Sequence, residues 1–343
     1  MEYIAEFALF FAKTITLIGG LLAAVLVVTA VGQKTRKLHK GHLEVTKLNE
    51  HFQQLKESLQ HALLDKEALK KLSKDEKKKA KKEKGAVTEP KSRVFVIDFH
   101  GDIKASGVKS LREEVTAVLS MAQPDDEVVI RLESAGGMVH SYGLASSQLC
   151  RIRSKGIRLT IAVDKVAASG GYMMACTGDR IISAPFAVIG SIGVMAQLPN
   201  FNKILKKNDV DLELHTAGEF KRTLTVFGEN TDKGREKFKQ DIEDTHGLFK
   251  NFIKDYRGKV DIEKVATGEV WYGQKAVEMK LVDELMTSDE YIGLKAENAD
   301  VVQVAYVVKK GVADKLGMVA HGAIDTTLLK WWERLNGSRF FSS

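Results

Sequence analysis

A serine followed at once by two glycines is the stretch of this chain best suited to chemistry. Ser169 lies in 166–172, directly before Gly170 and Gly171. Glycines let the backbone turn sharply and let a substrate carbonyl approach backbone N–H groups. A predicted helix begins at Ser169, so the hydroxyl would lie at a helix N-terminus, which favours developing negative charge. Taken alone, the stretch favours a serine that caps the helix, because serine is among the best N-caps.

A second glycine pair, Gly136 and Gly137, follows a predicted strand at 128–132 and enters a helix. The backbone N–H of Gly136 can bind an oxyanion, with the N–H of Gly170 as the second donor. The simpler interpretation of this pair is a turn that needs glycine for a positive φ.

The base that would activate a nucleophilic serine is less obvious. The chain has no Gly-x-Ser-x-Gly elbow, and neither His140 nor Asp102 has a context distinctive of a triad. A lysine can act as the base when burial and missing counter-charges lower its pKa. Lys221 lies in a Gly-containing turn after a predicted strand at 211–215, where an ordinary surface lysine would fit equally well.

These motifs together resemble the signal peptide peptidase A family of Ser/Lys proteases, over about 93–290 of the chain. The separation of 52 residues between Ser169 and Lys221 also fits the family. The matching stretches are Ala168–Tyr172, the Ser-Ala-Gly-Gly turn at 134–137, the Gly-x-x-Lys at 218–221, and 270–276 with 281–284.

The resemblance implies a role for each matching residue. Ser169 would be the nucleophile and Lys221 the general base. Gly136 and Gly170 would supply the oxyanion hole, and Ser191 would orient the lysine amine. The resemblance also implies an α/β fold of the ClpP/crotonase type, a spiral of ββα units assembled into a homo-oligomeric ring or dome.

Two positions depart from the family pattern. Ala135 stands where the family often has proline, which leaves the N–H of Gly136 unchanged. Met173 stands where a second aromatic residue is frequent, which alters the wall of the pocket. No metal or cofactor is implied, and the expected substrates are peptides or proteins with small or apolar side chains, such as signal-peptide remnants or damaged proteins.

Two other functions remain open from the sequence. A membrane-anchored scaffold of the same fold could carry a silent Ser/Lys pair, although a scaffold needs neither glycine turn. A crotonase-like acyl-CoA enzyme shares the fold and the oxyanion hole, but it needs no lysine at position 221 and no anchor.

Short apolar runs separated by helical patterns predict the architecture of the central domain, 93–290. Strands alternating with helices favour parallel pairing with right-handed crossovers. The uncharged run 181–198 contains Pro185, Gly190 and Gly193, so we interpret it as a buried strand-turn-strand and not as a membrane span. The predicted strands are 94–99, 128–132, 159–163 and 180–184, and the predicted helices are 108–122, 137–154, one from 169, 232–257 and 274–280.

The N-terminal region, 1–33, is predicted to be a transmembrane anchor. Residues 14–32 carry no charge and are long enough to span a bilayer. A cleaved signal peptide is the competing interpretation, but Glu2 and Glu6 precede the run where such peptides are basic. Lys34 and Arg36 follow it, which places the domain in the cytoplasm by the positive-inside rule. Relatives that act on exported signal peptides face outward, so we expect a bacterial inner (plasma) membrane location with the side left open.

A basic, partly helical or disordered linker is expected at 34–92. From Lys34 to Arg93, 18 Lys and Arg stand against nine Asp and Glu, while the whole chain carries +7. The positive charge therefore belongs to this segment, and it lacks the interleaved aromatic residues that would favour nucleic-acid binding. Cys150 and Cys176 form no metal or redox spacing. We expect the C-terminal extension, 291–343, to take part in oligomerisation.

Overall fold

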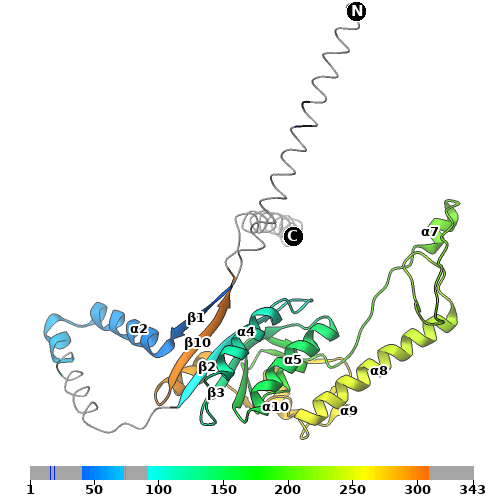
Figure 1. Ribbon diagram of the computed structural model, residues 1–343. Helices are drawn as coiled ribbons and strands as arrows, with labels where there is room; N and C mark the ends of the chain where they lie inside the picture. Colours follow the sequence, from blue (N-terminus) through cyan, green and yellow to red (C-terminus); the bar gives the residue numbers. More distant parts are fainter. Residues whose placement is uncertain (1–15, 17–18, 20–40, 73, 75–91, 309–343) are drawn as a thin grey trace, which may run out of the picture. The chain divides into compact units, whose positions relative to one another are not determined.

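The computed structural model describes residues 16, 19, 41–72, 74 and 92–308 (Figure 1). One compact unit comprises Glu44–Ala305, and the chain ends, Met1–Leu43 with Tyr306–Ser343, form another of which few residues are described. Apart from Thr16 and Gly19, the expected anchor lies outside the described residues, as does the C-terminal stretch from 309. No helix within the described part is long and apolar enough to cross a bilayer.

A ten-stranded sheet forms the centre of the fold, and its pairing is mixed. Neighbouring strands from β10 to β9 are parallel, while β5 (Val166–Ala168) leaves this row to pair with β3 and β7 (Val188–Gly190), and β8 (Val270–Tyr272) pairs antiparallel to β7. The protein is therefore an α/β protein with a mixed sheet. The main row runs β1 (His42–Lys47), β10 (Asp300–Val307), β2 (Arg93–Gly101), β3 (Glu127–Ser134), β4 (Arg158–Val163), β6 (Arg180–Ser183) and β9 (Glu284–Leu285).

The central strands are buried on both faces, which explains their continuous apolar runs. Along β2, Phe95, Ile97 and Phe99 point into one hydrophobic cluster, and the alternate Val94 and Val96 point into a second cluster across the sheet. The four strands predicted from such runs are all present.

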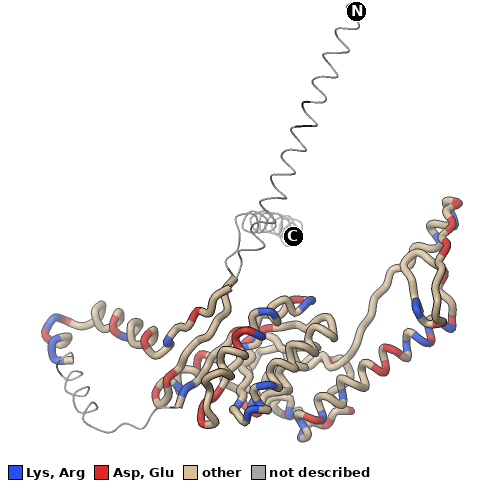
Figure 2. Tube along the Cα trace, in the orientation of Figure 1, with Lys and Arg blue, Asp and Glu red and all other residues tan. Residues whose placement is uncertain are grey.

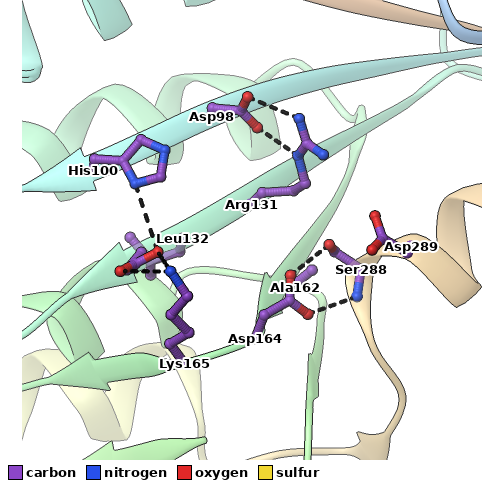
Figure 3. A pocket seen from close by; sticks show the side chains of 10 residues that line it. Asp98, His100, Arg131, Leu132, Ala162, Asp164, Lys165, Ser288 and Asp289 are labelled. Atoms are coloured by element: carbon purple, nitrogen blue, oxygen red, sulfur yellow. Dashed lines mark hydrogen bonds and ion pairs between the residues drawn. The ribbon is translucent and has the colours of Figure 1, made fainter.

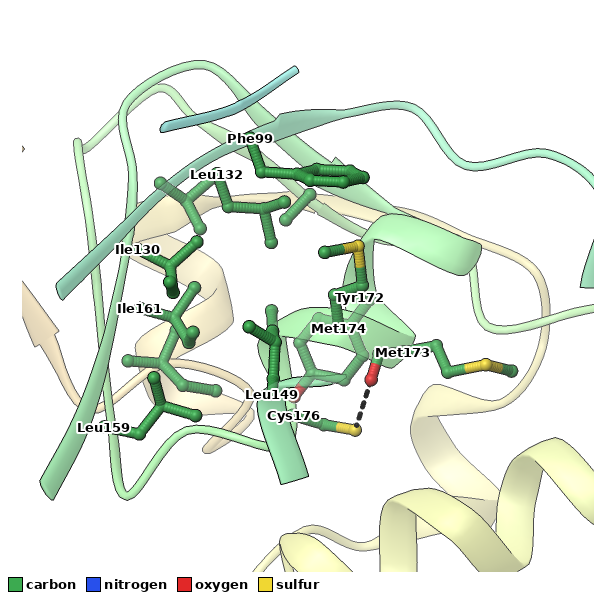
Figure 4. Packing of buried hydrophobic residues seen from close by; sticks show 14 of the residues in the cluster. Phe99, Ile130, Leu132, Leu149, Leu159, Ile161, Tyr172, Met173, Met174 and Cys176 are labelled. Atoms are coloured by element: carbon green, nitrogen blue, oxygen red, sulfur yellow. Dashed lines mark hydrogen bonds between the residues drawn. The ribbon is translucent and has the colours of Figure 1, made fainter. Parts of the chain in front are cut away.

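Three helices cover the first face of the sheet: α4 (Val108–Leu119), α5 (Val139–Ser154) and α6 (Gly170–Ala175). Figure 4 shows Leu149 of α5 and Tyr172 of α6 packed against strand side chains such as Ile161. Cys176 is fully buried here, and this burial raises the pKa of its thiol far above the ordinary value, so it packs as a small apolar side chain.

Helix α11 (Ser288–Ala296) and the start of α2 (Leu48–Leu63) pack on the second face. Leu48, Tyr291 and Ile292 join its hydrophobic cluster. The sheet therefore extends beyond 93–290, since β1 lies next to β10 at its edge and Leu48 belongs to the core.

The segment between β7 and α8 (Asp232–Tyr256) contains one short helix, α7 (Asn202–Lys207). Residues 211–215 carry no regular structure, so the strand predicted there is wrong. Leu212 and Leu214 alternate as in a strand but are 49% and 53% exposed, and no described strand pairs with them.

Helix α8 is anchored at its two ends. The Thr231 hydroxyl caps its start by accepting from the N–H of Gly234, and Phe249 and Ile253 enter the core near its end. Charges of both signs follow each other along the helix (Figure 2). The fold continues with α9 (Ile262–Val265) and α10 (Gly273–Glu278).

Candidate active site

Ser169 occupies the turn between β5 and α6 in a strained conformation. Its φ of 52° and ψ of −120° lie where residues with a Cβ rarely occur, at a cost of about 1–3 kcal/mol. It is the N-cap residue of α6, yet its side chain makes no capping hydrogen bond. Capping therefore does not account for a serine here, and the half-buried hydroxyl is left for another role.

The two glycines expected to form an oxyanion hole lie against Ser169. Gly136 has φ +90°, and a Cβ added to it would lie 2.7 Å from both the Ser169 Cβ and the Gly170 nitrogen. Glycine is thus required at 136 by conformation and by close approach. The structure brings Ser169, Gly136 and Gly170 together at the carboxyl ends of β3 and β5.

The backbone N–H groups of the glycine turn differ in their partners. The Gly136 N–H donates a 3.1 Å hydrogen bond to Ser134 Oγ, so this donor is already engaged. The N–H of Gly137 has no hydrogen-bond acceptor among the described residues. Of the two amides, only that of Gly137 is therefore free to receive an oxyanion without breaking a bond.

Ser191 directly follows β7, the strand that pairs with β5, and Ser169 directly follows β5. The N–H of Ser169 donates a 2.8 Å hydrogen bond to the carbonyl of Gly190, the residue before Ser191. Ser191 also has a positive φ of 50°, and its own N–H donates to the carbonyl of Glu269 at 2.6 Å. Two serines with left-handed backbone thus adjoin each other where β5 and β7 end.

Lys221 is exposed and lies in the 191–231 segment. Its N–H bonds the carbonyl of Gly218, and the preceding residues Glu219 and Phe220 contact Lys233 at the start of α8 through an ion pair and a cation–π contact. In the described part of the chain, Lys221 Nζ has no ion-pair partner and no contact joins it to Ser169. The structure does not bring the expected base to the expected nucleophile within one chain.

His140 and Asp102, the alternative triad partners, are not joined to Ser169 or to each other by any bond between described residues. His140 is exposed in the first turn of α5. The Asp102 carboxylate accepts the N–H of Ser106 at 2.7 Å, a bond that lowers the pKa of Asp102. It therefore stabilises a turn.

A polar pocket of about 320 Å³ lies at the strand ends (Figure 3) and contains none of the expected site residues. Two of its four carboxylates are paired with its two cations, and a third, Asp164, accepts hydrogen bonds from Ser288. Arg131 forms two hydrogen bonds with Asp98, and Lys165 pairs with Glu133 at 3.0 Å. The ion pairs identify it as a cross-strand charge cluster.

Two buried residues next to the glycine turn were not predicted as site residues. The Ser134 and Tyr142 hydroxyls are 2.6 Å apart, and their residues are 1% and 0% exposed. Ser134 is the first residue of the Ser-Ala-Gly-Gly turn. Tyr142, eight residues later, belongs to no motif, so nothing in the sequence singles it out.

The sequence comparisons give the class of protein. Residues 2–149 match the N-terminal region of peptidase family S49, and residues 151–302 match peptidase family S49 itself. This chain belongs to that family.

Similar proteins match over most of the chain. A probable protease SohB from Haemophilus influenzae is 48% identical over 330 residues, covering 93% of each chain. Another probable protease SohB, from Buchnera aphidicola subsp. Schlechtendalia chinensis, is 48% identical over 85% of this chain and 99% of its own. Protease 4 of Haemophilus influenzae is more distant, at 27% identity over 59% of this chain and 33% of its own.

Proposed function

We propose that this chain is a membrane-anchored serine endopeptidase with Ser169 as nucleophile and Lys221 as general base. The observation that carries the proposal is the strained, non-capping conformation of Ser169 against Gly136 and Gly170. Membership of a peptidase family and the protease names of the relatives support the reaction class.

The mechanism is acyl transfer. Ser169 Oγ attacks a peptide carbonyl carbon while Lys221 Nζ takes the hydroxyl proton. The resulting oxyanion accepts hydrogen bonds from the N–H of Gly170 and from the glycine turn, where the Gly137 N–H is free and Gly136 would have to release Ser134. The leaving amine takes the proton from the lysine. Water then attacks the acyl-enzyme by the same route, and no cofactor takes part.

A second copy of the chain would supply the lysine. Lys221 lies in a segment whose apolar side chains are unusually exposed, as expected for a surface that another subunit covers. Covering it would also remove water from the amine, which is how a lysine becomes a base. The exposed apolar residues of this segment include Leu198, Phe201, Ile204, Leu212, Leu214, Phe220 and Phe227, at 41–57%.

The remaining parts of the proposal rest on the sequence. A ClpP/crotonase-like spiral assembled as a ring or dome suits a site shared between copies, and Ser191 would orient the amine. The uncharged run 14–32 supports a single-pass anchor in a bacterial inner membrane, and peptides released there would be substrates. A reporter fused to the C-terminus would report the side of the membrane on which the domain lies.

Peptide hydrolysis by purified wild type and Ser169→Ala tests this function. Loss of turnover in the variant, with an unchanged unfolding temperature, is expected because nothing else in the site replaces the hydroxyl. Undiminished turnover in Ser169→Ala would reject the assignment. Hydrolysis of acyl-CoA in place of peptides would favour the crotonase-like alternative.

A further inference from the structure

A chain of hydrogen bonds links the glycine turn to the loop after β2. The Gly136 N–H donates to Ser134 Oγ at 3.1 Å, Ser134 Oγ lies 2.6 Å from Tyr142 Oη, and Tyr142 Oη donates to the carbonyl of Asp102 at 2.7 Å. A carbonyl oxygen only accepts, so the tyrosine proton is committed to Asp102. Ser134 must then donate to Tyr142 and accept from Gly136. The chain of bonds therefore has a single direction.

Burial makes this chain of bonds rigid. Ser134 and Tyr142 are almost inaccessible to solvent, so a hydroxyl that lost its partner would pay the desolvation penalty of a buried polar group. Gly101 lies opposite Ser134 in the β2–β3 register, and a Cβ there would lie 2.4 Å from both hydroxyl oxygens. Only glycine leaves space for the two oxygens to meet.

The Tyr142 ring contacts the other side of the oxyanion hole. A Cβ added to Gly170 would lie 2.4 Å from Tyr142 Cγ, so the ring packs directly against the backbone of the residue after Ser169. One buried side chain thus touches Gly170 through its ring and the glycine turn through its hydroxyl and Ser134.

We propose that Tyr142, acting through Ser134, is the positioning residue that sets the distance between the glycine turn and Gly170. The inference rests on the proposed serine peptidase function. By holding the Gly136 N–H, Ser134 fixes the plane of the turn, whose Gly137 N–H has no acceptor among the described residues. Donors preorganised in this way stabilise the transition state more than the bound substrate. Their loosening lowers kcat and leaves KM nearly unchanged.

The test compares Tyr142→Phe, Ser134→Ala and the double variant in the full chain, using a fluorogenic peptide. Each single variant is expected to lower kcat by about 10- to 100-fold with KM within about twofold, as for small misplacements of reacting groups. The kcat of the double variant should be no lower than that of the more impaired single variant, because both hydroxyls act in one chain of bonds.

Tyr291→Phe is the matched control, because it removes another buried tyrosine hydroxyl, one that donates to Glu127 at 2.6 Å within the cluster on the second face. It should keep kcat. If Tyr142→Phe fails to fold, Ser134→Ala decides, since it keeps the ring. The positioning role alone would be overturned if Ser134→Ala, and Tyr142→Phe where it folds, kept the wild-type kcat. This conclusion requires that Ser169 of the wild type still reacts with a fluorophosphonate. A wild type that neither cleaves peptides nor reacts at Ser169 would overturn the proposed function, and this inference with it.

Discussion

The N–H of Ser169 donates a 2.8 Å hydrogen bond to the carbonyl of Gly190, immediately before Ser191. This bond continues the β5–β7 ladder, in which Ala168 pairs with Gly190, by one step into the turn. The backbone therefore fixes the spacing between Ser169 and Ser191, and neither side chain needs to hold the other. A base that contacted Ser191 would therefore also lie close to Ser169.

Replacing Ser191 tests whether its hydroxyl orients the lysine amine. Ser191→Ala and Ser191→Gly should both lower kcat by about 10- to 100-fold, because each removes the hydroxyl. The two should differ in stability, because only glycine relieves the positive φ of 50° at this position. Activity and thermal unfolding measured together separate the effects. If activity rises and falls with stability instead, Ser191 has a structural role only.

Mixing inactive variants tests whether Lys221 acts across subunits. Ser169→Ala and Lys221→Met should each be inactive alone, and their co-assembly should restore activity. In a closed ring with one shared site per neighbouring pair, random equal mixing gives about a quarter of wild-type activity. Peptide turnover after co-expression measures the recovery.

Arg222→Met is the matched control for Lys221→Met, because it removes the neighbouring exposed cation. It should remain active. No recovery in mixed assemblies that are shown to contain both variants would mean that one chain supplies both residues, with the 191–231 segment rearranged.

Much of the central sheet could be predicted because its strands are buried on both faces. The run containing Ile97 and that containing Ile130 are apolar at nearly every position, which distinguishes them from loops. β1 could not be recognised, because all six of its side chains are exposed and its place at the sheet edge depends on β10, more than 250 residues away.

In the candidate site, too, some residues can be predicted from local motifs and others depend on tertiary packing. Ser169, Gly136 and Gly170 belong to short motifs whose glycines have a local conformational cause, so the sequence indicates them. Tyr142 acts through contacts that only the packing of α5 creates. The placement of Lys221 depends on a segment with few core contacts, so no local pattern fixes its distance from Ser169.

Stability should fall at acid pH through Asp283. Burial alone would raise the pKa of this carboxyl, but hydrogen bonds from Arg257 and Lys259 outweigh it and hold the pKa below its ordinary value of 3.8. A lowered folded-state pKa gives stability that is present above the unfolded value and lost as pH falls through the folded one. The Asp283 contribution should thus be complete at about pH 6 and decline below about pH 4.

Urea unfolding of wild type and Asp283→Asn measures this contribution. At neutral pH the variant should be less stable by about 3–5 kcal/mol, because Arg257 is only 3% exposed and would lose its charge partner. The gap should narrow on acidification below about pH 4. An equal gap at neutral and acid pH would show that Asp283 does not titrate with folding.

The most direct measurement is the reaction of the purified full chain with a fluorophosphonate, mapped by mass spectrometry. The proposed chemistry predicts a single adduct on Ser169 Oγ, lost in Ser169→Ala and strongly slowed in Lys221→Met. A wild-type protein that hydrolyses peptides without modification at Ser169, or that is modified at another serine, would contradict it.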